Sequence, residues 1–329
     1  MVKRALVIGC GSIARRHIKN LRLTFPLAEI ICMSSSGRDI NVKEMRVNRT
    51  IVTFSEAISL NPDIVIVASP ASHHLAHAKP FLKRKIPVLI EKPLCAYYDE
   101  LVDYDINLRD LKVAVGYNLR FLPALKVVRE VLDEGVLGKI SSVFATVGQY
   151  LPDWRPGLDY KKSVSAKRSL GGGALLELSH ELDYLNFLFG SFSEVLAITG
   201  FSGLLDIDVE DSVHALLKSK TGVICNMHLD FLQRRPTRTL KIVGQYGNLD
   251  CDLIENNITL SFSSDKIEVL LCDTHYNHND TYVEQLNAFV NFSKSDVAFS
   301  TTVDSSIEVM RLIKAIRLSD QKKMWIQLS

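Results

Sequence analysis

Near its N-terminus the chain reads Ala5-Leu6-Val7-Ile8-Gly9-Cys10-Gly11-Ser12-Ile13-Ala14, an apolar run followed by two glycines and a small residue. Residues 5–8 predict a short buried strand, and the apolar spacing of residues 13–23 predicts a helix. A G-x-G-x-x-A motif between a strand and a helix is typical of a dinucleotide-binding turn. The first glycine allows the tight turn, the second lets the backbone approach a pyrophosphate, and the small third residue lets helix and strand pack closely. A merely tight turn is the alternative interpretation.

The residues after the next predicted strand, 29–33, bear on which dinucleotide binds. In NAD-binding proteins this strand is followed by an acidic residue that bonds the ribose. Here it is followed by Ser34-Ser35-Ser36-Gly37-Arg38, whose hydroxyls and guanidinium suit a 2′-phosphate. Arg15 and Arg16 would add positive charge or stack on adenine, unless they belong to a solvated helix face. We therefore expect NADP, with NAD as the alternative.

A charged pair ends another predicted strand, residues 88–90. Strands and helices alternate through the first third of the chain, which predicts a doubly wound parallel sheet. Glu91-Lys92-Pro93 follows the strand, so its charges should stand at the carboxyl edge of the sheet, where ligands bind. Pro93 disfavours a helical conformation for Lys92. We expect Lys92 to be held at this edge as a functional residue.

Two histidines, His73 and His77, follow the strand predicted at residues 63–68. Their i, i+4 spacing on a helix is one that can chelate a metal ion. No carboxylate or cysteine completes the set, so we expect no metal here.

The composition limits the class of protein. With 329 residues the chain should form two domains, and 47% hydrophobic with 23% charged residues is ordinary for a globular protein. A net charge of +2 argues against nucleic-acid and membrane partners, and no apolar run approaches the roughly 20 residues that span a bilayer. The six cysteines form no C-x-x-C pair, which favours reduced thiols in a cytoplasmic protein.

A second set of polar residues lies in the middle of the chain. Trp154 and Arg155 stand in a polar loop and offer a flat face and charge-assisted donors to a hydroxyl-rich or anionic substrate, although an ordinary surface loop is the alternative. After three glycines, residues 174–188 predict one helix on which Glu177, His180 and Asp183 fall at i, i+3 and i+6. Histidine between carboxylates suits proton transfer. Alternating segments from residue 195 to 271 predict an antiparallel sheet.

Four motifs occur in one order: G-x-G-x-x-A, Ser-Pro-x-x-His-His, Glu-Lys-Pro, and Gly116-Tyr117-Asn118-x-Arg120-Phe121-x-Pro123. In this the chain resembles the Gfo/Idh/MocA family of nicotinamide-dependent oxidoreductases. The resemblance implies an α/β protein with an N-terminal Rossmann domain, at residues 1–121. A C-terminal α/β domain with a large, mostly antiparallel open sheet would then occupy residues 122–329. It also implies a homodimer or homotetramer formed through that sheet, and the chain looks similar to a subgroup of bacterial surface-glycan sugar biosynthesis enzymes.

The resemblance implies roles for particular residues. His180 and Asp183 match the family pattern, whereas Glu177 matches only with a one-residue gap. The expected catalytic residues are Lys92, His180, Asp183 and Glu177. The expected cofactor contacts are Gly9, Gly11, Ser12, Ile13, Ser34, Ser35, Arg38, Ser69, Pro70, His74, Glu91 and Lys92. The expected substrate contacts are Tyr117, Asn118, Arg120, Trp154, Arg155, Glu177 and His180.

We therefore expect hydride transfer between nicotinamide and a ring hydroxyl or ketone of a sugar or nucleotide sugar. His180 would exchange the proton, and Lys92 would hydrogen-bond the reacting oxygen. A cationic nicotinamide nearby would disfavour a second charge, which makes Lys92 an alternate acid or base. Two alternatives stay open: a dinucleotide-sensing regulator without catalysis, and an epimerase or lyase that recycles its cofactor.

Overall fold

The computed structural model describes residues 2–34, 37, 40–263, 266–295, 297 and 299–328. These described residues form two compact units. The first contains the chain up to Asn118 together with Asn279–Ile307, and the second contains Leu119–His278 together with the chain from Glu308 onwards. The sequence prediction had placed residues 279–307 in the second domain, whereas the structure groups them with the first unit.

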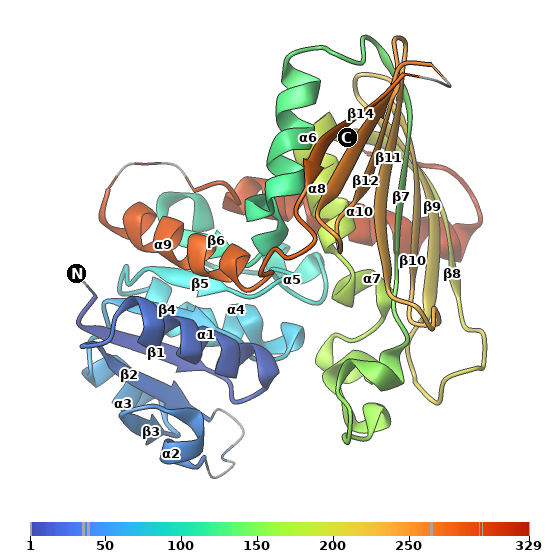
Figure 1. The fold of residues 1–329 in the computed structure, drawn as a ribbon. Coiled ribbons are helices and arrows are strands. Elements are labelled where there is room, and N and C mark those ends of the chain that lie inside the picture. The colour runs from blue at the N-terminus through green and yellow to red at the C-terminus, as the bar shows by residue number, and fades with distance from the viewer. Residues whose placement is uncertain are drawn as a thin grey trace. The chain divides into compact units, whose positions relative to one another are not determined.

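The described strands of the first unit form one parallel six-stranded sheet in the order β3-β2-β1-β4-β5-β6 (Figure 1). This is the strand order of a doubly wound dinucleotide-binding sheet. Strands are added on one side of β1 as far as β3, and the chain then continues on the other side with β4. The predicted Rossmann fold is confirmed. The strands are β1 (Arg4–Ile8), β2 (Glu29–Met33), β3 (Arg49–Ile51), β4 (Ile64–Val67), β5 (Val88–Ile90) and β6 (Val113–Val115). The α-helices are α1 (Ser12–Thr24), α2 (Val42–Met45), α3 (Phe54–Ser59), α4 (His74–Leu82), α5 (Asp99–Val102) and α9 (Asp280–Lys294), with 3₁₀ turns η1 (Ala71–His73) and η2 (Leu108–Asp110).

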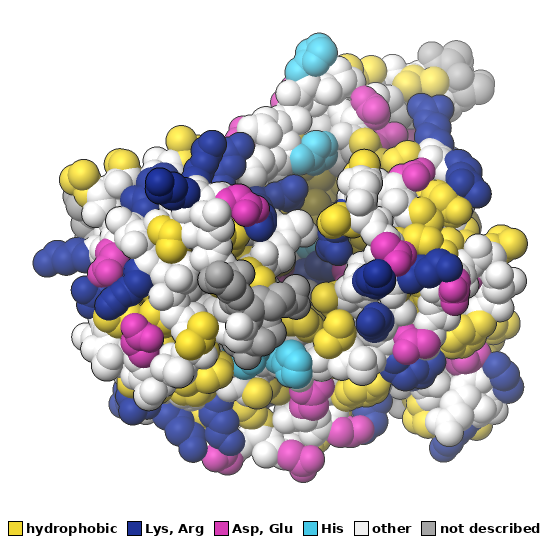
Figure 2. Space-filling view, turned by 90° about the horizontal axis from the view of Figure 1, so that it is seen from below, with side chains coloured by type: hydrophobic (Ala, Val, Ile, Leu, Met, Phe, Trp, Pro, Cys, Tyr) yellow, Lys and Arg dark blue, Asp and Glu magenta, His cyan; other side chains and the backbone are white. Residues whose placement is uncertain are grey.

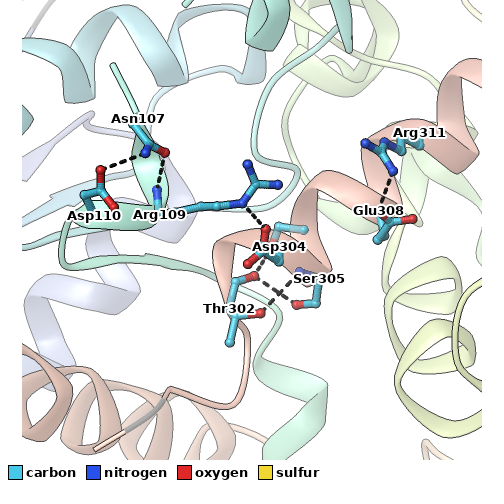
Figure 3. A network of polar contacts seen from close by, with 9 residues as sticks. Asn107, Arg109, Asp110, Thr302, Asp304, Ser305, Glu308 and Arg311 are labelled. Atoms are coloured by element: carbon cyan, nitrogen blue, oxygen red, sulfur yellow. Dashed lines mark hydrogen bonds and ion pairs between the residues drawn. The ribbon is translucent and has the colours of Figure 1, made fainter. Parts of the chain in front are cut away.

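Residues 279–307 join the first unit through both apolar and polar contacts. Helix α9 packs against α1 and buries Leu286 and Phe289. Thr301 Oγ1 donates to the carbonyl of Val115 at the end of β6. Arg109 Nε donates to Asp304 Oδ1 at the start of α10 (Val303–Lys322), as Figure 3 shows. This return of the chain rests on contacts between residues far apart in sequence, so no local pattern predicted it.

The second unit is built on nine described strands in the order β14-β13-β12-β11-β7-β10-β9-β8-β15. All neighbours pair antiparallel except β7 and β10, which run parallel. The predicted, mostly antiparallel sheet is therefore confirmed. The strands are β7 (Ile140–Gly148), β8 (Phe192–Gly200), β9 (Ser212–Ser219), β10 (Ile224–Asp230), β11 (Thr237–Gly244), β12 (Asn248–Asp252), β13 (Asn257–Ser261), β14 (Ile267–Cys272) and β15 (Ile326–Gln327).

Burial alternates along the central strands of this sheet, so one face is covered and the other is open. Helices α6 (Pro123–Asp133), α7 (Ala174–Glu177) and α8 (His180–Phe189) contact the sheet (Figure 1). On the open face, Phe144 and Ile198 keep 44% and 60% of their surface exposed. The 3₁₀ turns are η3 (Asn118–Phe121), η4 (Leu151–Trp154), η5 (Tyr160–Lys162), η6 (Val164–Ala166) and η7 (Arg168–Leu170).

The helix predicted over residues 174–188 is interrupted, which corrects the sequence interpretation. Leu178 leaves the helical region with φ −103° and ψ 28°, so α7 ends at Glu177 and α8 begins at His180. Glu177 and His180 therefore do not share one face of a continuous helix. At the other end of α7, Ala174 N donates to the Glu210 carbonyl and Leu175 N donates to the Glu210 side chain.

Within the described residues, no helix combines the length and the apolar character that a membrane span requires. Basic and acidic side chains are interspersed on the face in Figure 2, in keeping with a net charge of +2.

Candidate active site

The turn between β1 and α1 requires glycine at its first position. Gly9 has φ +123°, and a Cβ atom there would overlap the carbonyl oxygen of Ala68, which follows β4. Gly11 begins α1 as its N-cap, and in the part of the chain that the structure describes no side chain caps the first turn. Ser12 and Ile13 form that turn. Its N–H groups and the positive end of the helix dipole are thus available for a phosphate.

The end of β2 is only partly described. Ser34 is buried, and its N–H donates to the Ile51 carbonyl. Ser35 and Arg38, both predicted to contact the cofactor, lie outside the described residues. Arg15 Nη1 pairs with Glu44 Oε1 at 2.8 Å, and the Arg16 guanidinium lies 4.6 Å from the centre of the Tyr282 ring.

The loop after β4 is held by two histidines. His74 is buried, with Nε2 2.8 Å from the Ser69 carbonyl oxygen and Nδ1 2.8 Å from that of Pro93, so its ring links the loops after β4 and β5. Burial lowers the pKa of His74, although both carbonyls oppose the shift. His77 Nδ1 lies 2.9 Å from Ser69 Oγ, and the His77 ring stacks on His73.

No group of three or more His, Cys, Asp or Glu side chains that could hold a metal ion occurs among the described residues.

Glu91-Lys92-Pro93 stands at the carboxyl end of β5, as predicted from its apolar strand. Glu91 N donates to the Val67 carbonyl at 2.8 Å, and Lys92 is half-buried. The Glu91 side chain turns inward, where its Oε1 lies 2.6 Å from His17 Nε2. Sequence reasoning had placed Glu91 against the cofactor and had missed His17; a polar residue on the buried face of the first helix was the available signal.

The motif at residues 116–120 is divided between the two units. Tyr117 is buried, and Asn118 Nδ2 donates to Thr281 Oγ1 at 2.7 Å within the first unit. In the second unit, Arg120 makes a bidentate pair with Asp183: Nε and Nη2 lie 2.9 and 2.7 Å from the two carboxylate oxygens. The Arg120 guanidinium also lies over the Phe187 ring.

The Arg120–Asp183 pair joins two residues with separate predicted roles. Asp183 was expected to be catalytic and Arg120 to contact substrate, and their side chains are bonded to each other. Burial raises the pKa of Asp183, and the Arg120 charge opposes the rise. His180 opens α8 and is 8% exposed.

Other protein atoms lie close to the glycines that precede α7, so a side chain there would not fit. A Cβ at Gly172 would overlap the Val164 carbonyl, and one at Gly173, with φ +107°, would overlap the Glu210 carboxylate. The space beside these two glycines is filled by the chain itself. Sequence reasoning missed Glu210, whose pKa is raised by burial. Glu177, at the far end of α7, is half-buried.

Trp154 and Arg155 lie at the end of η4. The Trp154 indole packs edge-on against Phe231 and donates through Nε1 to the Gln149 carbonyl at 3.2 Å. Trp154 and Arg155 are both half-buried, so each keeps part of its surface for a ligand.

Comparisons with known proteins agree with this architecture. The sequence model described as "Oxidoreductase family, NAD-binding Rossmann fold" matches residues 3–118, and that described as "GFO/IDH/MocA C-terminal domain" matches residues 125–250. An uncharacterized oxidoreductase of Synechocystis sp. is 32% identical over 43% of this chain and 39% of its own length. The myo-inositol 2-dehydrogenase of Thermotoga maritima is 26% identical over 88% of this chain and 87% of its own.

Among solved structures, the WlbA dehydrogenase of Bordetella pertussis, in complex with NADH and UDP-GlcNAcA, superposes with a TM-score of 0.83. The superposition covers 100% of this chain and 98% of that one at 20% identity, a similarity that establishes the shared fold.

Proposed function

Because the chain belongs to the Gfo/Idh/MocA family of oxidoreductases, which has an NAD-binding Rossmann fold, we propose that it oxidises or reduces a ring carbon of a sugar or nucleotide sugar. One relative is a myo-inositol 2-dehydrogenase, and WlbA was solved with UDP-GlcNAcA. The match to the Synechocystis relative spans well under half of either chain, so the proposal draws on the longer similarities.

The observation that carries the proposal is the position of Lys92 within the first unit. β4 pairs with β1 on one side and with β5 on the other, so the Gly9 turn and Lys92 lie at the same carboxyl edge of the sheet. In open α/β sheets this edge binds the ligand, next to the point where the strand order reverses. This edge therefore has a phosphate site for the dinucleotide and, close to it, a lysine for the substrate that reacts with the dinucleotide.

The residues at this edge fit a dinucleotide. Gly9 makes the tight turn, and the uncapped start of α1 supplies N–H donors for a pyrophosphate. When bound, the cofactor supplies or accepts the hydride. Lys92 hydrogen-bonds the reacting oxygen. The loop residues Ser69 and Pro70 line the same edge, and His74 fixes this loop through its contact with the Ser69 carbonyl.

The second unit supplies the proton-handling and substrate groups. We assign proton exchange with the carbinol oxygen to His180, since imidazole titrates near neutral pH. Arg120 and Asp183 hold α8, from which His180 projects. Glu177, Trp154 and Arg155 are the proposed substrate contacts.

We further propose a preference for NADP over NAD. β2 ends at Met33 and is followed by Ser34, without the acidic residue that bonds the adenosine ribose in NAD-binding proteins. Titration with NADPH and NADH, followed by cofactor fluorescence, measures the preference; tighter binding of NADH would contradict it.

We also propose that copies of the chain associate through the open face of the nine described strands, where Phe144 and Ile198 are exposed. A Phe144→Asp variant that stays oligomeric in size-exclusion chromatography with light scattering would exclude this face. We place the enzyme in the cytoplasm, in keeping with cysteines that form no disulfide among the described residues.

The decisive experiment incubates the purified protein with NADP or NAD and a panel of free sugars, inositols and nucleotide sugars. Cofactor absorbance and product mass are recorded together. Reduction of the cofactor with loss of two hydrogens from one substrate supports the proposal. Product formation without a net absorbance change would indicate an epimerase or lyase, and binding without any product would indicate a regulator.

A further inference from the structure

A histidine–carboxylate pair is buried behind the strand end that carries Lys92. The side chains of His17 and Glu91 are 1% and 8% exposed, and their nearest atoms lie 2.6 Å apart. His17 belongs to α1 and Glu91 follows β5, so the pair joins the helix of the glycine turn to the lysine-bearing strand end. Because an apolar pair would avoid the desolvation cost of these groups, stability alone gives little reason for this arrangement.

The second oxygen of Glu91 acts on Lys92 directly. Lys92 N donates to Glu91 Oε2 at 3.2 Å, which fixes the backbone from which the lysine side chain leaves. On the other side, a Cβ atom at Gly116 would lie 3.0 Å from the same oxygen. Glycine at position 116 therefore leaves the room in which the carboxylate stands.

The groups that face Glu91 come from three elements: His17 from α1, His74 from α4, and Lys92 itself. Burial acts to raise the pKa of Glu91, but the His17 hydrogen bond and these positive or ionisable neighbours outweigh it and hold the pKa below its usual range. Glu91 is thus a carboxylate near neutral pH. His17 Nδ1 is buried and meets no hydrogen-bond partner in the described part of the chain, and Tyr282 packs edge-on against the ring. Glu91 is therefore the polar group toward which the imidazole is oriented.

The geometry points to His17 and Glu91 as positioning residues that keep a carboxylate beside Lys92 and fix its backbone at the reacting edge. This inference deepens the function proposed above and rests on it. The pair thereby determines where the Lys92 side chain leaves the backbone.

The position of Lys92 is measurable without a sugar substrate. Lys92 in the purified full-length chain is acylated with an amine-reactive ester, and the modified peptide is quantified by mass spectrometry. We expect Glu91→Gln to change the rate of modification about threefold or more, because the contacts that fix the backbone of Lys92 are weakened and its amine is presented differently to the reagent. His17→Gln should change the rate in the same direction by a smaller factor, since the carboxylate remains but is no longer fixed.

Kinetics test the positioning effect. We expect Glu91→Gln to lower kcat about tenfold or more, because Lys92 is then displaced from its reacting position. The Kd for NADPH should stay within about threefold of the wild-type value. Glu91→Asp keeps the charge and should recover part of the loss in kcat. The matched control is Asn20→Ala. Asn20 is buried and belongs to the same helix as His17, but its side chain bonds to Asn279 rather than to Glu91.

Asn20→Ala should lower the melting temperature but leave both Lys92 modification and kcat at wild-type values. Equal modification rates in wild type and Glu91→Gln would overturn the inference, as would a change of the same size in Asn20→Ala. If Glu91→Gln fails to fold, His17→Gln decides the labelling experiment. A wild-type protein that acts on no sugar would refute the proposed function, whereas the labelling result would still decide the role of the pair.

Discussion

Arg120 and Asp183 are bonded to one another through two hydrogen bonds, although 63 residues separate them in the sequence. Their side chains are 4% and 1% exposed, so each neutralises a charge that water does not reach. The pair joins η3 to the first turns of α8, the helix that His180 begins. Arg120 therefore supports the start of α8, and its contact with substrate stays a prediction.

Breaking this pair from one side should be costly. Arg120→Met leaves a buried carboxylate without its cation, and we expect the free energy of unfolding to fall by about 3–5 kcal/mol. Urea unfolding followed by circular dichroism measures the change. The control is Lys241→Gln, which removes an exposed cross-strand partner of Asp250 and should cost no more than about 1 kcal/mol. Equal losses in the two variants would show that the buried pair contributes nothing particular.

The two glycines of the β1–α1 turn should respond differently to alanine. Gly9→Ala places a side chain on a backbone with φ +123° and against the Ala68 carbonyl, so it should weaken both folding and NADPH binding. Gly11→Ala meets no protein atom within 4 Å and should leave the melting temperature nearly unchanged. Its Cβ atom would stand where a pyrophosphate approaches, so NADPH binding should still fall about tenfold or more. Unaltered binding in Gly11→Ala would place the cofactor elsewhere.

Lys92→Met should separate binding from chemistry. The substitution keeps the length of the side chain and removes its proton donor, so we expect kcat to fall about a hundredfold or more. The Kd for NADPH, from cofactor fluorescence, should stay close to the wild-type value because the glycine turn is untouched. Full activity in this variant would remove Lys92 from the mechanism.

Acidification should destabilise the protein through His77. Burial, with His73 and His74 nearby, lowers the pKa of His77 from 6.5 to about 4, so the unfolded chain binds a proton at a higher pH than the folded one. The stabilising contribution of neutral His77 is complete above pH 6.5 and is lost as the pH falls toward 4. His77→Gln should therefore show a shallower loss of stability over that interval in urea unfolding. His275→Gln changes an exposed histidine and serves as the comparison; a wild-type slope in His77→Gln would contradict the prediction.

Much of the first unit was predictable because its signals are local. The spacing of Gly9, Gly11 and Ala14 expresses steric demands of one turn, and the apolar runs around it express burial on both faces of a parallel sheet. The same holds for Lys92, whose position at a strand end follows from the run that precedes it. Alternating burial likewise made the antiparallel strands of the second unit predictable.

The sequence by itself determined the order of strands and helices, the glycine turn and the strand end that carries Lys92. Only the tertiary structure decided that Glu91 turns inward to His17, that Arg120 pairs with Asp183, that Glu210 accepts from the first N–H groups of α7, and that residues 279–307 return to the first unit. The physical reason is that periodicity and turn chemistry act within a few residues. The partner of a buried charge, in contrast, is whichever group the folded chain brings within hydrogen-bonding distance.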